Sequence, residues 1–451
     1  MNIEATCFKA YDIRGRVPDE LNPALAERIG NAFAAHFRPS TVVTGRDVRL
    51  SGPEIAGSLT RGLVKAGVNV LDMGVCGTEE IYFAAASLDV DGGIIVTASH
   101  NPADYNGMKM VLRGAVPVSG DSGLDTVREI ALSKEEKLAD HPGSSKKVDN
   151  RPAYINHLLR FIDIDRLTPL KIVVNSGNGC AGPVIDMLEQ HLPFRFIKLQ
   201  HEPDGSFPNG VPNPLLPENR AITGQAVRQH GADMGIAWDG DFDRCFFFDE
   251  QGKFIEGYYV VGMLAGAMLK KTPGRKIVHD PRLVWNTVDI VKKAGGIPVM
   301  SKTGHAFIKE RMRLENALYG GEMSAHHYFR DFAYCDSGMI PWLMTAEMLC
   351  GANVPLSAFV AEMQDRFPVS GEINSVVHDP DRVIEQIEKI YGDMPDAETD
   401  HTDGLSVSFP DFRFNIRKSN TEPVLRLNVE TRGDPALMEE KRDELLSIIR
   451  G

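Results

Sequence analysis

Three aspartates separated by single residues stand in the segment WDGDFDRC, which begins at Trp238. They are Asp239, Asp241 and Asp243, and in an extended backbone this spacing places three carboxylates on one side. Three negative charges so close together are costly unless a cation lies among them. Oxygen ligands suit a hard divalent ion such as Mg²⁺. The segment therefore predicts a metal site, and an acidic turn exposed to solvent is the alternative.

A serine follows an apolar run in the segment IIVTASHNPADYNGMK, residues 94–109. The run predicts a buried strand that ends close to Ser99, with His100 beside it and Lys109 ten residues on. Turn chemistry alone would explain Ser-His-Asn-Pro, and the pattern is not the G-x-S-x-G of acyl-transferring hydrolases. A metal cluster and an anion-binding loop elsewhere in the chain favour a serine that carries a phosphoryl group.

Two further polar loops could bind a phosphorylated sugar. The segment IRKSNTEPVLRL places Arg417, Ser419, Asn420 and Thr421 before a predicted strand. A guanidinium fork, hydroxyls and loop N–H groups can hold a phosphate, although the same residues are common in ordinary turns.

The segments KTGHAFIKERM and GGEMSAHHYFRD together form the second candidate binding region. Glycines followed by Glu322 and Ser324 suit a loop that binds sugar hydroxyls. His305 is a weaker candidate because buried structural histidines are common. The adjacent His326 and His327 would point in opposite directions on a strand, which argues against zinc.

A glycine pattern in NSGNGCAG offers a competing function. Gly177, Gly179 and Gly182 match GxGxxG between a predicted strand and helix, and Glu202 follows about 20 residues on, as in dinucleotide-binding folds. Similar stretches elsewhere carry GRD and DPR at the equivalent loop. A tight strand-to-helix turn therefore explains the glycines better than a nicotinamide cofactor does.

Three stretches of similar pattern must position these loops. They begin at Thr41, Leu170 and Arg275, and each reads as a strand, a polar loop, an amphipathic helix and another strand. This alternation predicts α/β units, whose ligands gather beyond the carboxyl ends of strands. Polar, turn-rich segments and a different C-terminal pattern predict domains at 1–150, 151–250, 251–367 and 368–451, the last a smaller α+β unit.

Composition narrows the class of protein. The 451 residues are 43% hydrophobic and 25% charged, as in a globular protein with ample core. We expect no membrane span and no signal peptide, because no apolar run is long enough and the start lacks a basic region. A net charge of −13 argues against nucleic acid as partner. Six scattered cysteines without a CxxC pair favour a reducing cytoplasm.

Taken together, these motifs resemble the α-D-phosphohexomutases, most closely the bacterial phosphomannomutases. TASHNP resembles the family's phosphoserine loop, DGDFDR its metal loop, GEMSAHH its sugar loop and RKSNTEP its phosphate loop, while KAYDIRG and KTGH also match. The motifs occur in family order over almost the whole chain. The resemblance implies α/β architecture with four domains around a central cleft.

The resemblance also assigns roles to residues. It implies that Ser99 is the phosphoserine, and that a phosphate oxygen on Ser99 completes the Mg²⁺ ligands given by the three aspartates. His100, Lys109, Arg244 and His305 would be catalytic, and Lys109, His305 and His100 are the candidates for general acid or base. Some members of the family have lysine at the position of Arg282. The remaining matched residues would bind substrate: Tyr11, Arg14, Arg282, Glu322, Ser324, Arg417, Ser419, Asn420 and Thr421.

The implied reaction interconverts mannose 6-phosphate and mannose 1-phosphate through a hexose 1,6-bisphosphate, which is intermediate and activator. Some activity on glucose phosphates is expected. The alternatives are a phosphoglucomutase or another phosphohexomutase, a haloacid-dehalogenase-type enzyme, a nicotinamide oxidoreductase and a non-catalytic sugar-phosphate sensor. The partner is a phosphorylated hexose, and the sequence leaves the oligomeric state open.

Overall fold

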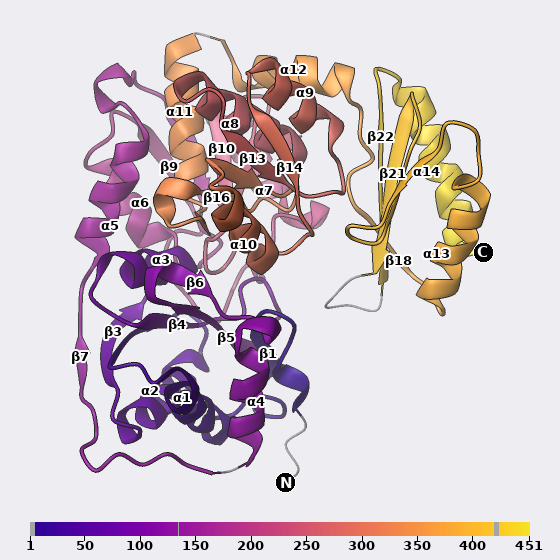
Figure 1. The fold of residues 1–451 in the computed structure, drawn as a ribbon. Helices are drawn as coiled ribbons and strands as arrows, with labels where there is room; N and C mark the ends of the chain where they lie inside the picture. Colours follow the sequence, from indigo (N-terminus) through magenta and orange to yellow (C-terminus); the bar gives the residue numbers. More distant parts are fainter. Residues whose placement is uncertain (1–4, 134, 353, 419–423) are drawn as a thin grey trace. The chain divides into compact units, whose positions relative to one another are not determined.

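The computed structural model describes residues 5–133, 135–352, 354–418 and 424–451. The chain forms two compact units. The first comprises Met1–Phe254 and Asp331–Asn353, and the second comprises Ile255–Arg330 and Val354–Gly451. Figure 1 labels the elements along the chain.

The three predicted strand-helix-strand repeats are present. They are β2 (Thr41–Arg46), α2 (Gly52–Lys65) and β3 (Asn69–Val75); β8 (Lys171–Asn175), α6 (Gly182–Glu189) and β9 (Arg195–Leu199); and β13 (Lys276–His279), α9 (Trp285–Lys293) and β14 (Ile297–Met300). The two strands of each repeat pair in parallel. The crossover helix between parallel strands accounts for the pattern that the sequence shows.

The first sheet has the order β1-β5-β4-β2-β3-β7. Helices α1 and α2 pack together on one face, and α3 lies on the other (Figure 1). Ile94 and Val96 face the first helix pair, whereas the Cβ position of Gly93 faces Ile81 of α3. The other elements are β1 (Ile13–Arg16), α1 (Pro23–Phe37), α3 (Thr78–Ser87), β4 (Gly92–Val96), β5 (Tyr105–Leu112), β6 (Val116–Pro117), α4 (Leu124–Ser133) and β7 (Ser145–Lys147).

The second sheet of the first unit contains the strands β11-β10-β8-β9 in that order. Strands β10 and β8 are parallel, and β10 and β11 form an antiparallel pair that brackets the predicted metal loop. The further elements are α5 (Arg151–Leu158), α7 (Ala221–His230), β10 (Met234–Trp238), β11 (Cys245–Phe248) and β12 (Phe254–Ile255).

A late segment of the chain completes the first unit. It holds β17 (Cys335–Asp336) and α11 (Ile340–Ala352), whose Trp342 side chain is fully buried. The carboxylate of Glu79 on α3 accepts hydrogen bonds from the Ser337 hydroxyl (2.9 Å) and from the backbone N–H of Gly338 (2.5 Å). An acidic side chain at the start of a helix is favoured by the helix dipole.

The second unit contains an α/β part and an antiparallel part. The first has strands in the order β14-β13-β15-β16, and the second is a sheet β18-β22-β21-β20-β19 with α13 and α14 on one face (Figure 1). The elements are α8 (Gly257–Lys271), α10 (His305–Glu315), β15 (Tyr319–Gly321), β16 (His327–Phe329), α12 (Leu356–Arg366), β18 (Ile373–Val376), α13 (Pro380–Tyr391), β19 (Glu398–Asp400), β20 (Leu405–Ser408), β21 (Phe412–Lys418), β22 (Val424–Thr431) and α14 (Pro435–Arg450).

The predicted fold class, three α/β units followed by a smaller α+β unit, is confirmed. Among the described residues, no single helix is both long and apolar enough for a membrane span, and α11 with α12 meet that test only as a bent pair. All six cysteines are free, and five of them are buried.

The GxGxxG glycines serve close backbone packing. Gly177 adopts φ 56°, a conformation that favours glycine. A Cβ at Gly179 would lie 2.6 Å from the carbonyl oxygen of Gly240, and a Cβ at Gly182 would lie 2.1 Å from that of His201. The Cys180 N–H donates to the Gly240 carbonyl at 3.0 Å. The turn therefore supports the loop that carries the aspartates.

We expect Gly182→Ala to destabilise the protein by about 1–3 kcal/mol, because the added methyl group overlaps a backbone oxygen. Urea unfolding measures this change. Gly57→Ala is the matched control: it lies in α2 with only the Arg61 side chain near, at 3.8 Å, and should stabilise by up to about 1 kcal/mol. Equal stability of the two variants would contradict the packing explanation.

Candidate active site

Ser99 stands after β4 in a strained, buried conformation. Its φ is 48°, in the left-handed region that serine rarely adopts, and its exposed fraction is 2%. The hydroxyl donates to Asp239 Oδ2 at 2.6 Å and lies 3.1 Å from His100 Nδ1. Backbone strain of this kind persists only where the surroundings impose it, and it concentrates at functional sites.

Arg49 imposes that conformation on the serine loop. Its guanidinium is fully buried and donates to the carbonyl oxygens of Ser99 (2.9 Å), Asn101 (2.6 Å), Pro102 (2.6 Å) and Tyr105 (2.9 Å). Four bonds from one planar cation fix the loop over seven residues.

Asp47 completes this support from the end of β2. Its carboxylate lies 3.3 Å from Arg49 Nε and accepts the Thr97 hydroxyl at 2.7 Å. The Thr97 hydroxyl oxygen in turn accepts the Ser99 N–H at 2.9 Å. Burial raises the pKa of Asp47, and the Arg49 charge opposes that rise.

The three predicted aspartates converge. Ligand oxygens of Asp239, Asp241 and Asp243 lie within 4.8 Å of one another, and all three side chains are buried. The backbone between β10 and β11 is a turn with Phe242 at φ 46°, so the expected extended backbone is wrong. The tight turn brings the carboxylates together although they do not alternate along a strand.

Three basic side chains neutralise this acidic cluster in part. Lys109 Nζ on β5 lies 2.8 Å from Asp241 Oδ2 and 2.5 Å from Asp243 Oδ2. Arg244 Nη2 lies 2.7 Å from Asp239 Oδ2. Arg14 is held by Asp12 at 2.8 Å and donates to Asn101 Oδ1 at 2.6 Å. The cations that an acidic protein needs for an anionic substrate are thus gathered locally.

Burial and charge shift the pKa values in opposite directions. Burial opposes the charge of Lys109, but Asp241 and Asp243 outweigh it and raise the pKa of the lysine. Burial and the neighbouring Asp241 raise the pKa of Asp243 well above its usual value. Burial and the nearby Arg244 and Arg14 lower the pKa of His100 well below its usual value.

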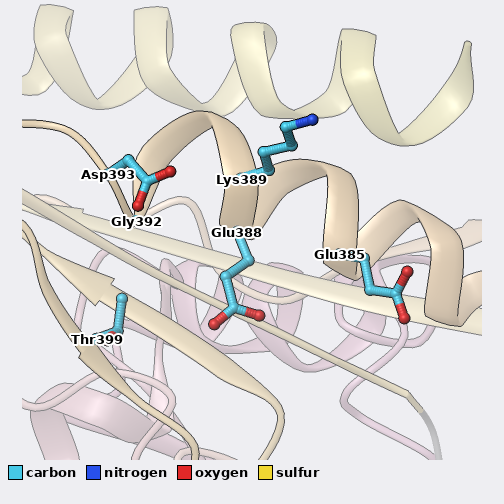
Figure 2. Close-up of a pocket in the computed structure, with 6 residues that line it drawn as sticks. All are labelled: Glu385, Glu388, Lys389, Gly392, Asp393 and Thr399. Atoms are coloured by element: carbon cyan, nitrogen blue, oxygen red, sulfur yellow. The ribbon is translucent and has the colours of Figure 1, made fainter.

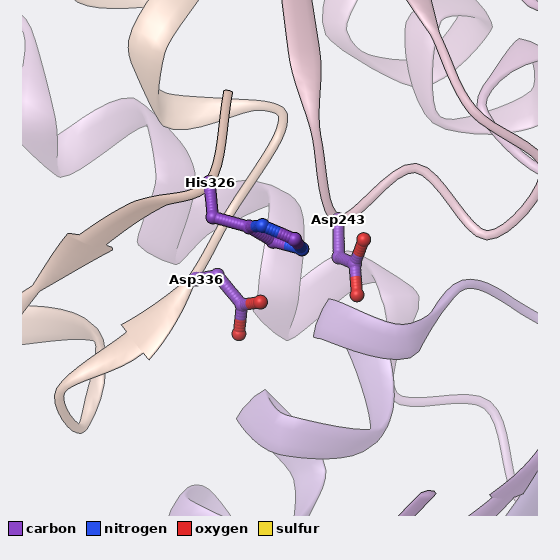
Figure 3. Close-up of side chains that lie close together, drawn as sticks. All are labelled: Asp243, His326 and Asp336. Atoms are coloured by element: carbon purple, nitrogen blue, oxygen red, sulfur yellow. The ribbon is translucent and has the colours of Figure 1, made fainter. Parts of the chain in front are cut away.

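The acidic cluster fits a divalent cation. Asp241 Oδ1 is buried without a hydrogen-bond partner, while Asp241 Oδ2 is held by Lys109 and by the Thr78 hydroxyl at 2.5 Å. Each fixed oxygen orients its carboxylate, as partners beyond the ligand shell do in metal sites. Asp336 of β17 adds a fourth acidic group near Asp243 and contributes to its raised pKa (Figure 3).

A second group of candidate residues lies in the second unit. Arg282, in the loop after β13, is 2% exposed. It lies 2.7 Å from Asp280, 3.3 Å from the Ser324 hydroxyl and 3.6 Å from Glu322 Oε1. Glu322 also accepts the Tyr328 hydroxyl at 2.5 Å. Burial raises the pKa of Glu322.

Arg417 on β21 belongs to the same group through Glu372. Its Nη2 lies 3.4 Å from Glu372 Oε2, which is 3.3 Å from Arg282 Nη1. His305 begins α10, one residue after Gly304, whose N–H donates to Glu322 at 2.9 Å. Tyr11 lies partly buried before β1, in the first unit. The predicted Ser419, Asn420 and Thr421 lie outside the described residues.

A surface hollow beside α13 contains none of the predicted site residues. Its walls carry the carboxylates of Glu385, Glu388 and Asp393, with Lys389 nearby (Figure 2). Acidic side chains on an exposed helix are common, and we assign this hollow no chemistry.

The residues that sequence analysis missed are Arg49, Asp47 and Glu372. Arg49 binds backbone carbonyls, which leave no signature in the side-chain sequence of the serine loop. The pattern GRDVR, residues 45–49, carries both Asp47 and Arg49, but these charged residues alone do not indicate that they hold another loop.

Comparison with known proteins identifies the family. Models of phosphoglucomutase/phosphomannomutase match residues 5–137 (alpha/beta/alpha domain I), 152–252 (domain II), 256–367 (domain III) and 372–447 (C-terminal domain). The phosphomannomutase of Salmonella montevideo is 59% identical, and the match covers 98% of this chain and 99% of that protein.

Two further relatives agree. The phosphohexose mutases of Xanthomonas campestris pv. campestris are 57% identical over 98% of this chain and 99% of theirs. A crystal structure of a phosphoglucomutase/phosphomannomutase family protein from Burkholderia thailandensis has a TM-score of 0.89 at 33% identity, covering 99% of this chain and 98% of that one. The chain belongs to the phosphoglucomutase/phosphomannomutase family.

We expect Arg49→Lys to lower kcat by about 100-fold in a mutase assay, with KM changed less than threefold. The ammonium group cannot reach four carbonyls, so the serine loop loses its fixed geometry, and small misplacements of reacting groups cost this much. Arg61→Lys is the control, because the Arg61 side chain is 58% exposed. A wild-type kcat in Arg49→Lys would contradict the role of the clamp.

Proposed function

We propose that this chain interconverts mannose 6-phosphate and mannose 1-phosphate through a phosphoserine at Ser99. The observation that carries the proposal is the hydrogen bond of 2.6 Å between Ser99 Oγ and Asp239 within the buried acidic cluster. Full-length relatives named phosphomannomutase support mannose as the sugar.

The reaction is proposed as two phosphoryl transfers. In the first, the phosphorylated Ser99 gives its phosphoryl group to the free hydroxyl of a mannose monophosphate. That hydroxyl loses its proton in the transfer. This step yields hexose 1,6-bisphosphate and an unmodified serine. The bisphosphate then turns over and returns its other phosphoryl group to Ser99, so that the enzyme is regenerated and the bisphosphate also serves as activator.

Asp239, Asp241 and Asp243 would hold Mg²⁺ together with a phosphate oxygen on Ser99. The ion, when bound, neutralises charge on the transferring group, which is the main requirement of phosphoryl transfer. Arg244 and Lys109 add fixed positive charge beside the same carboxylates. Lys109, His100 and His305 stay the candidates for proton transfer.

Recognition of the sugar is assigned to Glu322 and Ser324. C1 and C6 exchange places between the two transfers, so binding at O3 and O4 serves both orientations. Arg282 orients both side chains from within the second unit. Arg417 and Arg282 would bind the phosphate that is not transferred, and Tyr11 and Arg14 are proposed as further substrate contacts.

Other functions are less well supported. A phosphoglucomutase or broader phosphohexomutase is the second candidate, because relatives of similar identity are named phosphohexose mutases. A nicotinamide oxidoreductase loses its main support, since Gly179 and Gly182 of the GxGxxG pattern pack against backbone oxygens of this chain. The cytoplasmic location stays a prediction.

Loss of the nucleophile and loss of the metal should each abolish activity. We expect wild-type enzyme to convert mannose 1-phosphate in a coupled assay, and Ser99→Ala or an excess of EDTA to reduce the rate by at least about 1000-fold. Added Mg²⁺ should restore the chelated enzyme but not the variant. Mass spectrometry should find phosphate on Ser99, whereas phosphate on Asp241 would instead indicate a haloacid-dehalogenase-type enzyme, and no phosphorylation would favour a sensor.

Binding at O3 and O4 cannot distinguish mannose from glucose, which differ at C2. We therefore expect glucose 1-phosphate to be converted with a kcat/KM within about 100-fold of that for mannose 1-phosphate, a gap of less than about 3 kcal/mol. Parallel assays at equal substrate concentration measure the ratio. Undetectable glucose turnover would exclude the proposed mode of sugar recognition.

A further inference from the structure

Three arginines of the second unit surround one carboxylate, that of Glu372. Glu372 Oε2 lies 3.3 Å from Arg282 Nη1 and 3.4 Å from Arg417 Nη2, and Glu372 Oε1 lies 3.3 Å from Arg426 Nη1. Glu372 directly precedes β18, which pairs with β22. One carboxylate therefore links the α/β part of the unit to its antiparallel sheet.

The arginines form an arrangement that requires an anion. Arg417 and Arg426 are direct partners across the antiparallel strands β21 and β22. Like charges at such positions destabilise a sheet unless an opposite charge lies between them. The pKa of Glu372 is lowered because Arg282, Arg426 and Arg417 together outweigh its burial. The carboxylate is thus the resident anion of this cluster.

The cluster has capacity for a second anion. The Nε atoms of Arg282 and Arg417 are buried and have no hydrogen-bond partner. Their side chains are 2% and 5% exposed, whereas that of Glu372 is 22% exposed. The side chains of Arg282 and Arg417 are therefore enclosed by the protein, whereas the carboxylate of Glu372, like Arg426 at 19% exposed, reaches solvent. A phosphate presents oxygens to the same forks that now contact Glu372.

We propose that Glu372 is an internal competitor for the phosphate site: its carboxylate occupies the arginines without substrate and lowers their affinity for the phosphate that is not transferred. This inference rests on the proposed function.

A weakened affinity for phosphate suits a reaction in which the bound sugar must reverse its orientation between the two transfers. The same arginines must hold the C6 phosphate in one transfer and the C1 phosphate in the other, and must release the bisphosphate between them. Binding that stabilises substrate and transition state equally does not raise kcat. A carboxylate that returns to the arginines when the phosphate leaves shortens the time for which the bisphosphate is held in one orientation.

Glu372→Gln tests the proposal, because it removes the charge and keeps the shape. Binding of inorganic phosphate is measured by calorimetry on the full chain, without any turnover. We expect Glu372→Gln to bind phosphate about tenfold more tightly than wild type, and Arg417→Ala to bind it at least tenfold more weakly. Unchanged or weaker phosphate binding by Glu372→Gln would overturn the proposal.

Glu362→Gln is the matched control for net charge, because the Glu362 side chain is 80% exposed and lies in the same unit. It should leave phosphate affinity within twofold of wild type, and an equal gain in both variants would overturn the proposal. If Glu372→Gln does not fold, Glu372→Asp is used. Its shorter side chain weakens the contact, so phosphate affinity should rise at least threefold, and an unchanged affinity overturns the proposal.

The binding and activity measurements distinguish two failures. Absence of mutase turnover in the wild type would overturn the proposed function, whatever the phosphate affinities are. Normal turnover together with unchanged phosphate affinity in Glu372→Gln would overturn only the role of Glu372. For a folded Glu372→Gln, the proposal also expects kcat for mannose 1-phosphate to fall at least threefold as KM falls, and a wild-type kcat with a wild-type KM would contradict it.

Discussion

The structure can form only if the electrostatic repulsion among Asp239, Asp241 and Asp243 is compensated. Three carboxylates within 4.8 Å of one another, all buried, are unstable alone, because burial disfavours each charge and the neighbours add repulsion. Lys109 on β5 and Arg244 supply positive charge that offsets this repulsion. The ion pairs of Lys109 with Asp241 and Asp243 link the first domain to the second, as does the hydrogen bond from Ser99 to Asp239.

Arg49 is a second buried charge, and it holds the loop that places Ser99 beside the aspartates. A guanidinium without solvent is costly, and here four carbonyls and Asp47 compensate it. The compensation holds Ser99 in a left-handed conformation that an isolated chain would avoid. In the second unit the signs are reversed, because the single carboxylate of Glu372 stabilises three arginines. Both units thus use buried charge to fix geometry as well as to stabilise the fold.

Sequence reasoning found what local chemistry encodes. Strand-loop-helix patterns identified the three repeats, and single-residue spacing identified the aspartates. It missed Arg49 because the partners of Arg49 are main-chain oxygens about 50 residues away. It missed Glu372 because RFPVSGE reads as a linker, and only the folded sheet brings Arg417 and Arg426 to it. The predicted extended backbone of the metal loop was also wrong, because a turn and an extended segment can carry the same spacing of aspartates.

The return of α11 to the first unit has a consequence for biosynthesis. Trp342 is buried there, and Glu79 holds the start of the helix through Ser337 and Gly338. A ribosome delivers Phe254 long before Ala352, so the N-terminal body leaves the exit tunnel with its closing helix still untranslated. During that interval the apolar surface that Trp342 covers stays exposed, and it is closed only after about three quarters of the 451 residues have been translated.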